Sequence, residues 1–107
     1  MSPKSFLLTE DLHGYLLGSS TPLDPVLASL AAETAALGGV SRMQVAPEQG
    51  LLLTLLARAI GARRAVEVGT FTGYSALCIA RGLAGGGRLT CCDVSEEWTA
   101  VGRRHWQ

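Results

Sequence analysis

The sequence has no excess of charge of either sign and no long apolar run. Nine Lys and Arg residues balance nine Asp and Glu residues, so electrostatics give no reason to expect nucleic acid as a partner. No stretch approaches the roughly 20 apolar residues that span a bilayer, and the N-terminus does not look like a signal peptide. We therefore expect a cytoplasmic protein that binds neither nucleic acid nor membrane.

Cysteine and histidine are also scarce. The three cysteines are Cys78, Cys91 and Cys92, and an odd number without paired spacing argues against a disulfide framework. Cys91 and Cys92 fall in a predicted strand, where we expect them to point to opposite faces as buried apolar filler. The two histidines, His13 and His105, fall in separate predicted helices. We therefore expect no zinc site.

The residues that are present predict one globular domain that begins with helices. Hydrophobic residues make up 48% of the 107 residues, which is typical of a core-forming chain. Capping residues and apolar spacing predict three helices. These helices run from Glu10, after Thr9, to about Leu17; from Asp24-Pro25 to Gly38-Gly39; and, after a loop over Val40–Ala46, from Pro47 to Gly61.

The third of these helices has a wide apolar stripe. Leu52, Leu55, Leu56 and Ala59 follow the spacing of one helix face, widened by Leu51 and Ile60. We expect this stripe to pack in the core, and a surface that pairs with another copy is the alternative.

The second part of the chain changes to a strand–helix–strand pattern. The sequence predicts a buried strand over Ala65–Val68, a tight turn to Gly73, a helix from Tyr74 to about Leu83, a strand over Arg88–Asp93 and a last helix capped by Ser95. This order indicates an α/β, Rossmann-like fold with parallel strands. We expect a helical cap region over residues 1–61 and a βαβ unit over residues 62–107. Two strands do not cover a sheet, so we expect the N-terminal part of a larger single domain.

The turn after the first strand has the chemistry of a cofactor cradle. Glycine lets a backbone approach a ligand closely, and a helix N-terminus favours anionic groups. Glu67 stands where the dinucleotide-binding fingerprint has its first glycine, followed by Gly69 and Gly73. A carboxylate repels a pyrophosphate but suits a cation. The turn therefore favours S-adenosylmethionine (SAM), with its sulfonium and ammonium groups, over NAD.

Two further polar residues fit the same cradle. Asp93 ends the second strand, 20 positions after Gly73, where an acid accepts hydrogen bonds from ribose hydroxyls. Ser75 lies in the first turn of the following helix, where its hydroxyl and nearby N–H groups can bind a carboxylate. The acids Glu10, Asp11, Glu96 and Glu97 lie in first turns of other helices, where a favourable dipole interaction explains them.

From about Leu8 to its end, the sequence resembles the class I SAM-dependent O-methyltransferases of the caffeoyl-CoA and catechol type. The resemblance is carried by Met43–Gly50, Val66–Leu77 and Cys92–Trp98. It implies that the backbone of Val45 contacts the methionine end of SAM and that Glu67, Gly69 and Thr70 line the cofactor turn. It also implies that Ser75 holds the methionine carboxylate region and that Asp93 binds the ribose hydroxyls.

The resemblance implies methyl transfer from SAM to a phenolic or catechol hydroxyl, with a divalent metal, usually Mg²⁺, that lowers the pKa of that hydroxyl. It also implies a homo-oligomer, expected to be a dimer. Members of the family are roughly twice as long, and no residue here matches their metal-binding acids or catalytic lysine. We therefore nominate no catalytic or metal residue and expect the chain alone to be inactive. The alternatives are a fragment of an NAD-dependent oxidoreductase and a non-catalytic oligomerising module.

Overall fold

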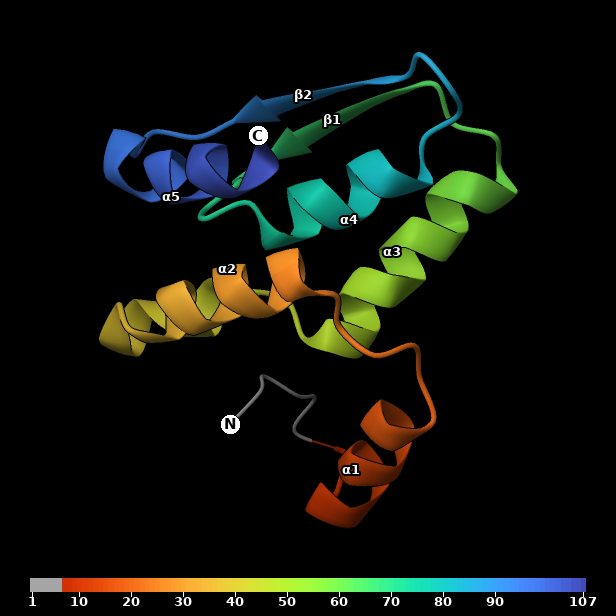
Figure 1. The fold of residues 1–107 in the computed structure, drawn as a ribbon, viewed down its shortest axis with the longest axis vertical. Coiled ribbons are helices and arrows are strands. Elements are labelled where there is room, and N and C mark those ends of the chain that lie inside the picture. Colours follow the sequence, from red (N-terminus) through yellow and green to blue (C-terminus); the bar gives the residue numbers. More distant parts are fainter. Residues whose placement is uncertain (1–6) are drawn as a thin grey trace.

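The computed structural model describes residues 7–107, which form an α/β chain (Figure 1). In chain order its elements are α1 (Glu10–Gly18), α2 (Pro25–Ala35), the 3-10 helix η1 (Gly38–Met43), α3 (Pro47–Ala59), β1 (Arg64–Val68), α4 (Tyr74–Gly82), β2 (Arg88–Cys92) and α5 (Glu96–Trp106). The predicted helices and strands are confirmed to within a few residues. The segment Val40–Ala46, predicted as a loop, instead contains part of η1. The first six residues of the predicted cap region lie outside the described residues, and the division at residue 61 stays a prediction.

Three helices begin at the residues that the sequence predicts as caps. The Thr9 hydroxyl accepts a hydrogen bond from the Leu12 N–H at 3.1 Å, and the Asp24 carboxylate accepts from the N–H groups of Val26 and Leu27. Ser95 caps α5 in the same way. These bonds satisfy backbone donors that a helix leaves free in its first turn, so local sequence fixes where each helix begins.

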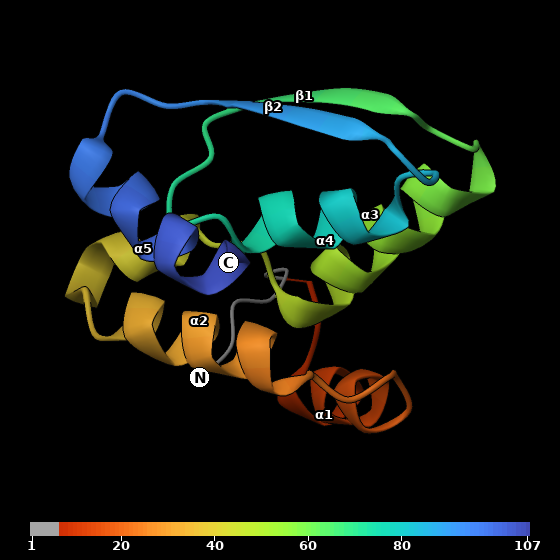
Figure 2. The same ribbon diagram turned by 45° about the horizontal axis from the view of Figure 1, so that its top comes forward.

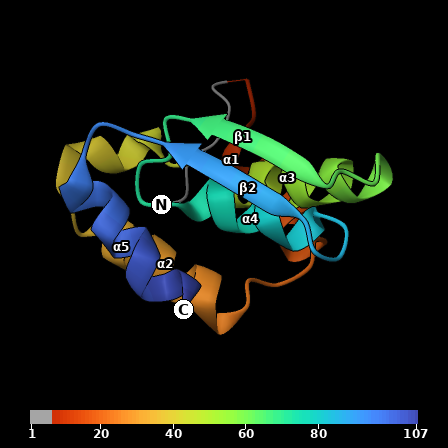
Figure 3. The ribbon, with the colours of Figure 1, turned by 90° about the horizontal axis from the view of Figure 1, so that it is seen from above.

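The two strands pair in parallel, with Val68 opposite Cys92. Figures 2 and 3 show the strands side by side, with the α-helices of the described part on one side of the sheet. The parallel pair joined by α4 confirms the predicted Rossmann-like βαβ unit.

The other face of the sheet is open among the described residues. Val66 and Val68 are 71% and 84% exposed, so the prediction of a buried strand is wrong here. Cys91 and Cys92 are also exposed, whereas Cys78 is buried. The prediction that Cys91 and Cys92 are buried filler is therefore wrong as well. For Cys92 the reason is that it lies opposite Val68, on the face that no described element covers.

α3 packs on α4 through small residues rather than through its leucines. A Cβ on Gly50 would lie 2.8 Å from Cys78 Sγ, and a Cβ on Gly82 would lie 2.5 Å from the Thr54 carbonyl oxygen. Leu52, Leu55 and Leu56 are each about half exposed, so the predicted core stripe is wrong. Close approach of the two backbones selects the glycine-bearing face of α3 and turns the leucines outward.

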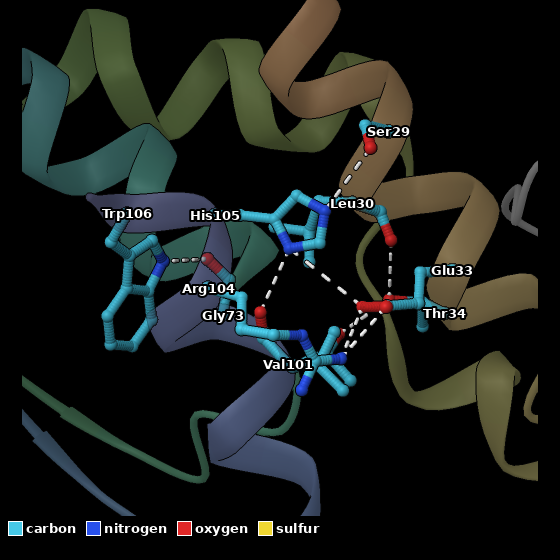
Figure 4. A network of polar contacts seen from close by, with 10 residues as sticks. Ser29, Leu30, Glu33, Thr34, Gly73, Val101, Arg104, His105 and Trp106 are labelled. Atoms are coloured by element: carbon cyan, nitrogen blue, oxygen red, sulfur yellow. Dashed lines mark hydrogen bonds and ion pairs between the residues drawn. The ribbon is translucent and has the colours of Figure 1, made fainter.

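α2 and α5 hold the end of the sheet that carries the turn after β1. Leu30, Tyr74, Cys78 and Val101 form the buried core. Figure 4 shows Arg104 of α5 bound to Glu33 of α2, at 2.8 Å and 3.0 Å. Below the surface, the Thr34 and Thr72 hydroxyls share a hydrogen bond of 2.7 Å. α2 is therefore attached directly to the turn.

No helix within residues 7–107 combines the length and the apolar character that crossing a membrane requires.

The packing of α3 on α4 predicts that Gly82→Ala destabilises the chain by about 1–3 kcal/mol, because the added methyl meets the backbone of α3. Gly14→Ala is the matched control, since nothing lies within 4 Å of its added Cβ in α1, and a gain of up to about 1 kcal/mol is expected from helix propensity. Urea unfolding followed by circular dichroism measures both. Equal effects of the two substitutions would contradict the close packing.

Candidate functional site

The turn between β1 and α4 has an unusual backbone. Gly69 and Gly73 have φ values of +89°, and Phe71 between them has a φ of +54°. Glycine adopts such values freely, but a bulky side chain in this region is strained by about 1–3 kcal/mol. The turn therefore needs contacts that hold Phe71 in place.

Asp93 and Trp98 supply those contacts from the second half of the βαβ unit. The Phe71 N–H donates to Asp93 Oδ2 at 2.7 Å. The Phe71 ring meets the Trp98 ring edge to face, with centroids 5.1 Å apart. Because Asp93 directly follows β2, the parallel register of the strands brings this carboxylate beside the turn.

The carboxylate of Asp93 is also bound by its own local backbone. The Ser95 N–H donates to Asp93 Oδ1 at 2.9 Å. The backbone N–H groups of Phe71 and Ser95 hold the pKa of Asp93 below its ordinary value, so this side chain is ionised at neutral pH. A carboxylate has about four lone-pair positions, which leaves Asp93 able to accept further hydrogen bonds from a ligand.

Gly73 fits only without a side chain. An added Cβ would lie 2.3 Å from Trp106 Cζ2, and the Trp106 indole N–H donates to the Gly73 carbonyl at 3.4 Å (Figure 4). The indole of α5 thus closes the end of the turn from which α4 starts.

Glu67 and Ser75 meet across the base of the turn. The Ser75 hydroxyl donates to Glu67 Oε2 at 2.5 Å, which fixes one oxygen of the carboxylate. The other, Glu67 Oε1, is buried and has no hydrogen-bond partner within residues 7–107. A buried carboxylate oxygen without a partner is unfavourable, so this position would gain from a cationic or hydrogen-bond-donating ligand.

A small cavity of about 70 Å³ adjoins the turn. Gln44 contributes a second buried oxygen, Oε1, that has no partner in the described part of the chain. A space of this size holds about two water molecules, so this cavity by itself does not enclose a larger molecule. The cavity is lined by Met43, Gln44, Val45, Gly69, Thr70, Phe71, Thr72, Tyr74 and Ser75.

The structure brings the predicted site residues together. Val45, Gly69, Thr70 and Ser75 line the one small cavity. Glu67 reaches this group through its bond to Ser75, and Asp93 reaches it through the Phe71 N–H.

Three further residues of this region were not predicted from the sequence to belong to a site. Gln44 lies directly before Val45, which is predicted from the sequence as a cofactor contact. Its polar side chain next to that contact could have identified Gln44 as a candidate as well. Phe71 and Trp98 gave no such signal, because a left-handed Phe and a ring contact between distant residues are consequences of the fold.

No group of three or more His, Cys, Asp or Glu side chains suited to a metal ion occurs in residues 7–107.

Comparison with known proteins gives consistent matches. The family model described as O-methyltransferase matches residues 18–107. The mouse catechol O-methyltransferase domain-containing protein 1 is 42% identical over 96 residues, which are 90% of this chain and 36% of that protein. The catechol O-methyltransferase of Mycobacterium tuberculosis is 38% identical over 98 residues, 91% of this chain and 44% of that protein.

Solved structures agree with the sequence matches. An O-methyltransferase from Bacillus cereus, solved in complex with SAH, is 35% identical and superposes with a TM-score of 0.79 over 86% of this chain and 41% of its own. The chain therefore spans less than half the length of each of these three proteins.

The bonds to Asp93 predict a pH-dependent contribution to stability. A folded-state pKa below the ordinary 3.8 means that this contribution is complete above that value and is lost as the pH falls through the lower, folded-state pKa. The difference in free energy of unfolding between the natural chain and Asp93→Asn should therefore be larger at about pH 6 than at about pH 3. Urea titrations at both pH values measure it.

Asp11→Asn, at an exposed first-turn acid of α1, is the control and should show a much smaller change between the two pH values. A difference for Asp93→Asn that stays constant with pH would contradict the role given to its carboxylate.

Proposed function

This chain belongs to the O-methyltransferase family, and we propose that it forms the SAM-binding part of an enzyme that methylates a phenolic or catechol hydroxyl. The Bacillus cereus relative was solved with SAH, the form that SAM takes after losing its methyl group. The Mycobacterium tuberculosis relative is named for catechol. The observation that carries the proposal is the buried Glu67 carboxylate, with one oxygen unpaired beside a glycine-rich turn.

The described residues fit SAM at several points. Glu67 Oε1 offers a negative, unsatisfied acceptor to a cationic group. No heavy atom lies within 4 Å of a Cβ built on Gly69, so the turn is open at this glycine. When bound, SAM supplies the methyl group from its positively charged sulfonium.

Different residues of the chain would then bind different parts of SAM. Glu67 compensates the positive charge of the ligand, while Gly69 and Thr70 line the turn. Val45 and Ser75 line the same small cavity, and the Val45 backbone and the Ser75 hydroxyl would hold the methionine end. Asp93, ionised and with lone pairs to spare, would accept hydrogen bonds from the ribose hydroxyls.

NAD suits this arrangement less well. A dinucleotide places its pyrophosphate against the glycine turn, and Glu67 would put a buried negative charge beside it. The family match supports the same choice. Glu67 therefore disfavours the oxidoreductase alternative on electrostatic grounds.

The remaining parts of the proposal concern the whole enzyme. We propose that the reaction uses a divalent metal such as Mg²⁺ to lower the pKa of the acceptor hydroxyl, and we assign no metal ligand among the described residues. We also propose a homodimer, as the resemblance to the family implies. Three cysteines without a disulfide support a reducing, cytoplasmic location.

The role of Glu67 predicts that Glu67→Gln weakens SAM binding by about 10- to 100-fold, the effect of losing one charge-assisted hydrogen bond. Glutamine keeps an acceptor for the Ser75 hydroxyl, so the fold should survive. Isothermal titration calorimetry with SAM measures the change, and Glu97→Gln, at an exposed first-turn acid of α5, should bind like the natural chain. Tighter binding of NAD than of SAM, or an unchanged affinity in Glu67→Gln, would contradict the proposal.

The 107-residue chain alone should not methylate catechol in the presence of SAM and Mg²⁺, because the described residues contain no group placed to hold the metal. Mass spectrometry of the reaction mixture tests this. Methylated catechol that accumulates in proportion to the protein concentration would overturn the expectation.

A further inference from the structure

A second and larger cavity lies on the side of the helices. Its volume is about 430 Å³, which is within the range of about 300–1,000 Å³ found for small-molecule sites. It lies between the end of α1, the segment that leads to α2, and the helices α3 and α4. Tyr74 is the single residue that lines both this cavity and the one at the glycine turn.

The walls of this cavity are mainly apolar. Leu17 of α1, Leu27 of α2 and Leu51 of α3 line it, together with Leu23 and Pro22 from the connecting segment. Apolar walls supplied by several elements favour a ligand with an apolar body, because burying that body removes it from water.

Tyr74, which lines this cavity, carries a buried polar atom without a hydrogen-bond partner in the described part of the chain. The residue is 2% exposed, and its hydroxyl has no hydrogen-bond partner within residues 7–107. Asp24, Glu48 and Arg81 line the same cavity as Tyr74, and their charges act on the phenol. Burial raises the pKa of Tyr74 to about 12, and the hydroxyl therefore keeps its proton and can donate.

The charged groups of the cavity largely satisfy one another. Arg81 forms an ion pair with Asp24, and Glu48 lies 3.1 Å from His13. Arg58 also lines the cavity, but it is exposed to solvent. Two arginines and two acids leave the lining without net charge, which favours a neutral ligand over an ion.

We propose that this cavity binds a neutral small molecule with an apolar ring and one acceptor oxygen, to which the Tyr74 hydroxyl donates a hydrogen bond. The ring occupies the space between the leucines, and the oxygen accepts from the Tyr74 hydroxyl, a buried donor that the described residues leave unpaired. This site is separate from the SAM cradle and does not rest on the proposed function.

The proposal is tested with a pair of ligands that differ in a carbonyl oxygen. Acetophenone and ethylbenzene are titrated into the ¹⁵N-labelled chain, and the amide shifts of Leu27, Leu51 and Thr54 are followed. Both ligands should give saturable shifts at these residues, and acetophenone should bind about 3- to 10-fold more tightly, as expected for one hydrogen bond. An absence of saturable shifts, or equal affinities, would overturn the proposal.

Variants test whether the Tyr74 hydroxyl causes the tighter binding of acetophenone. Tyr74→Phe removes only the oxygen and should abolish the preference for acetophenone, whereas Tyr15→Phe, at a tyrosine that is 75% exposed and outside the cavity, should keep it. Thr21→Trp, at an exposed residue of the lining, should abolish the saturable shifts of both ligands. A preference that persists in a folded Tyr74→Phe would refute the assignment. If that variant does not fold, the natural chain and Thr21→Trp decide the outcome.

Discussion

The backbone N–H of Phe71 donates to the carboxylate of Asp93, and the arrangement of the cradle depends on this bond. Phe71 adopts a left-handed conformation that is unfavourable for a bulky residue. The bond to Asp93, the ring contact with Trp98 and the parallel register of the strands compensate for that strain. The turn then leads from Glu67 to Ser75 in a geometry where their side chains meet.

The same turn connects to the helical layer below it. The Thr34–Thr72 hydrogen bond attaches α2, and Trp106 of α5 packs against Gly73. Tyr74 begins α4 and reaches the core, where it lies against Gly50 of α3. Tyr74 therefore adjoins both the cradle and the larger cavity among the helices. Local capping residues start α1, α2 and α5, but these long-range contacts set how the turn is held.

Much of this arrangement could be predicted from the sequence, because its signals are local. Thr9, Asp24 and Ser95 marked helix starts through their capping chemistry, and the glycine spacing after Glu67 marked the tight turn between β1 and α4. The face of α3 could not be predicted in this way. Hydrophobic periodicity favours the leucines, whereas the structure selects Gly50 for its small size, a preference that depends on how closely α4 approaches. The exposure of Val66 and Cys92 likewise depends on what covers the sheet, which the strand sequence does not encode.

We propose above all that the turn between β1 and α4 binds SAM through its charge and its open backbone. The most direct test is a titration of the ¹⁵N-labelled chain with SAM, followed by nuclear magnetic resonance. We expect saturable amide shifts that centre on Gly69–Ser75, on Val45 and on Asp93. Shifts that centre instead on α1 or α3, or no saturable shifts at any SAM concentration reached, would contradict it.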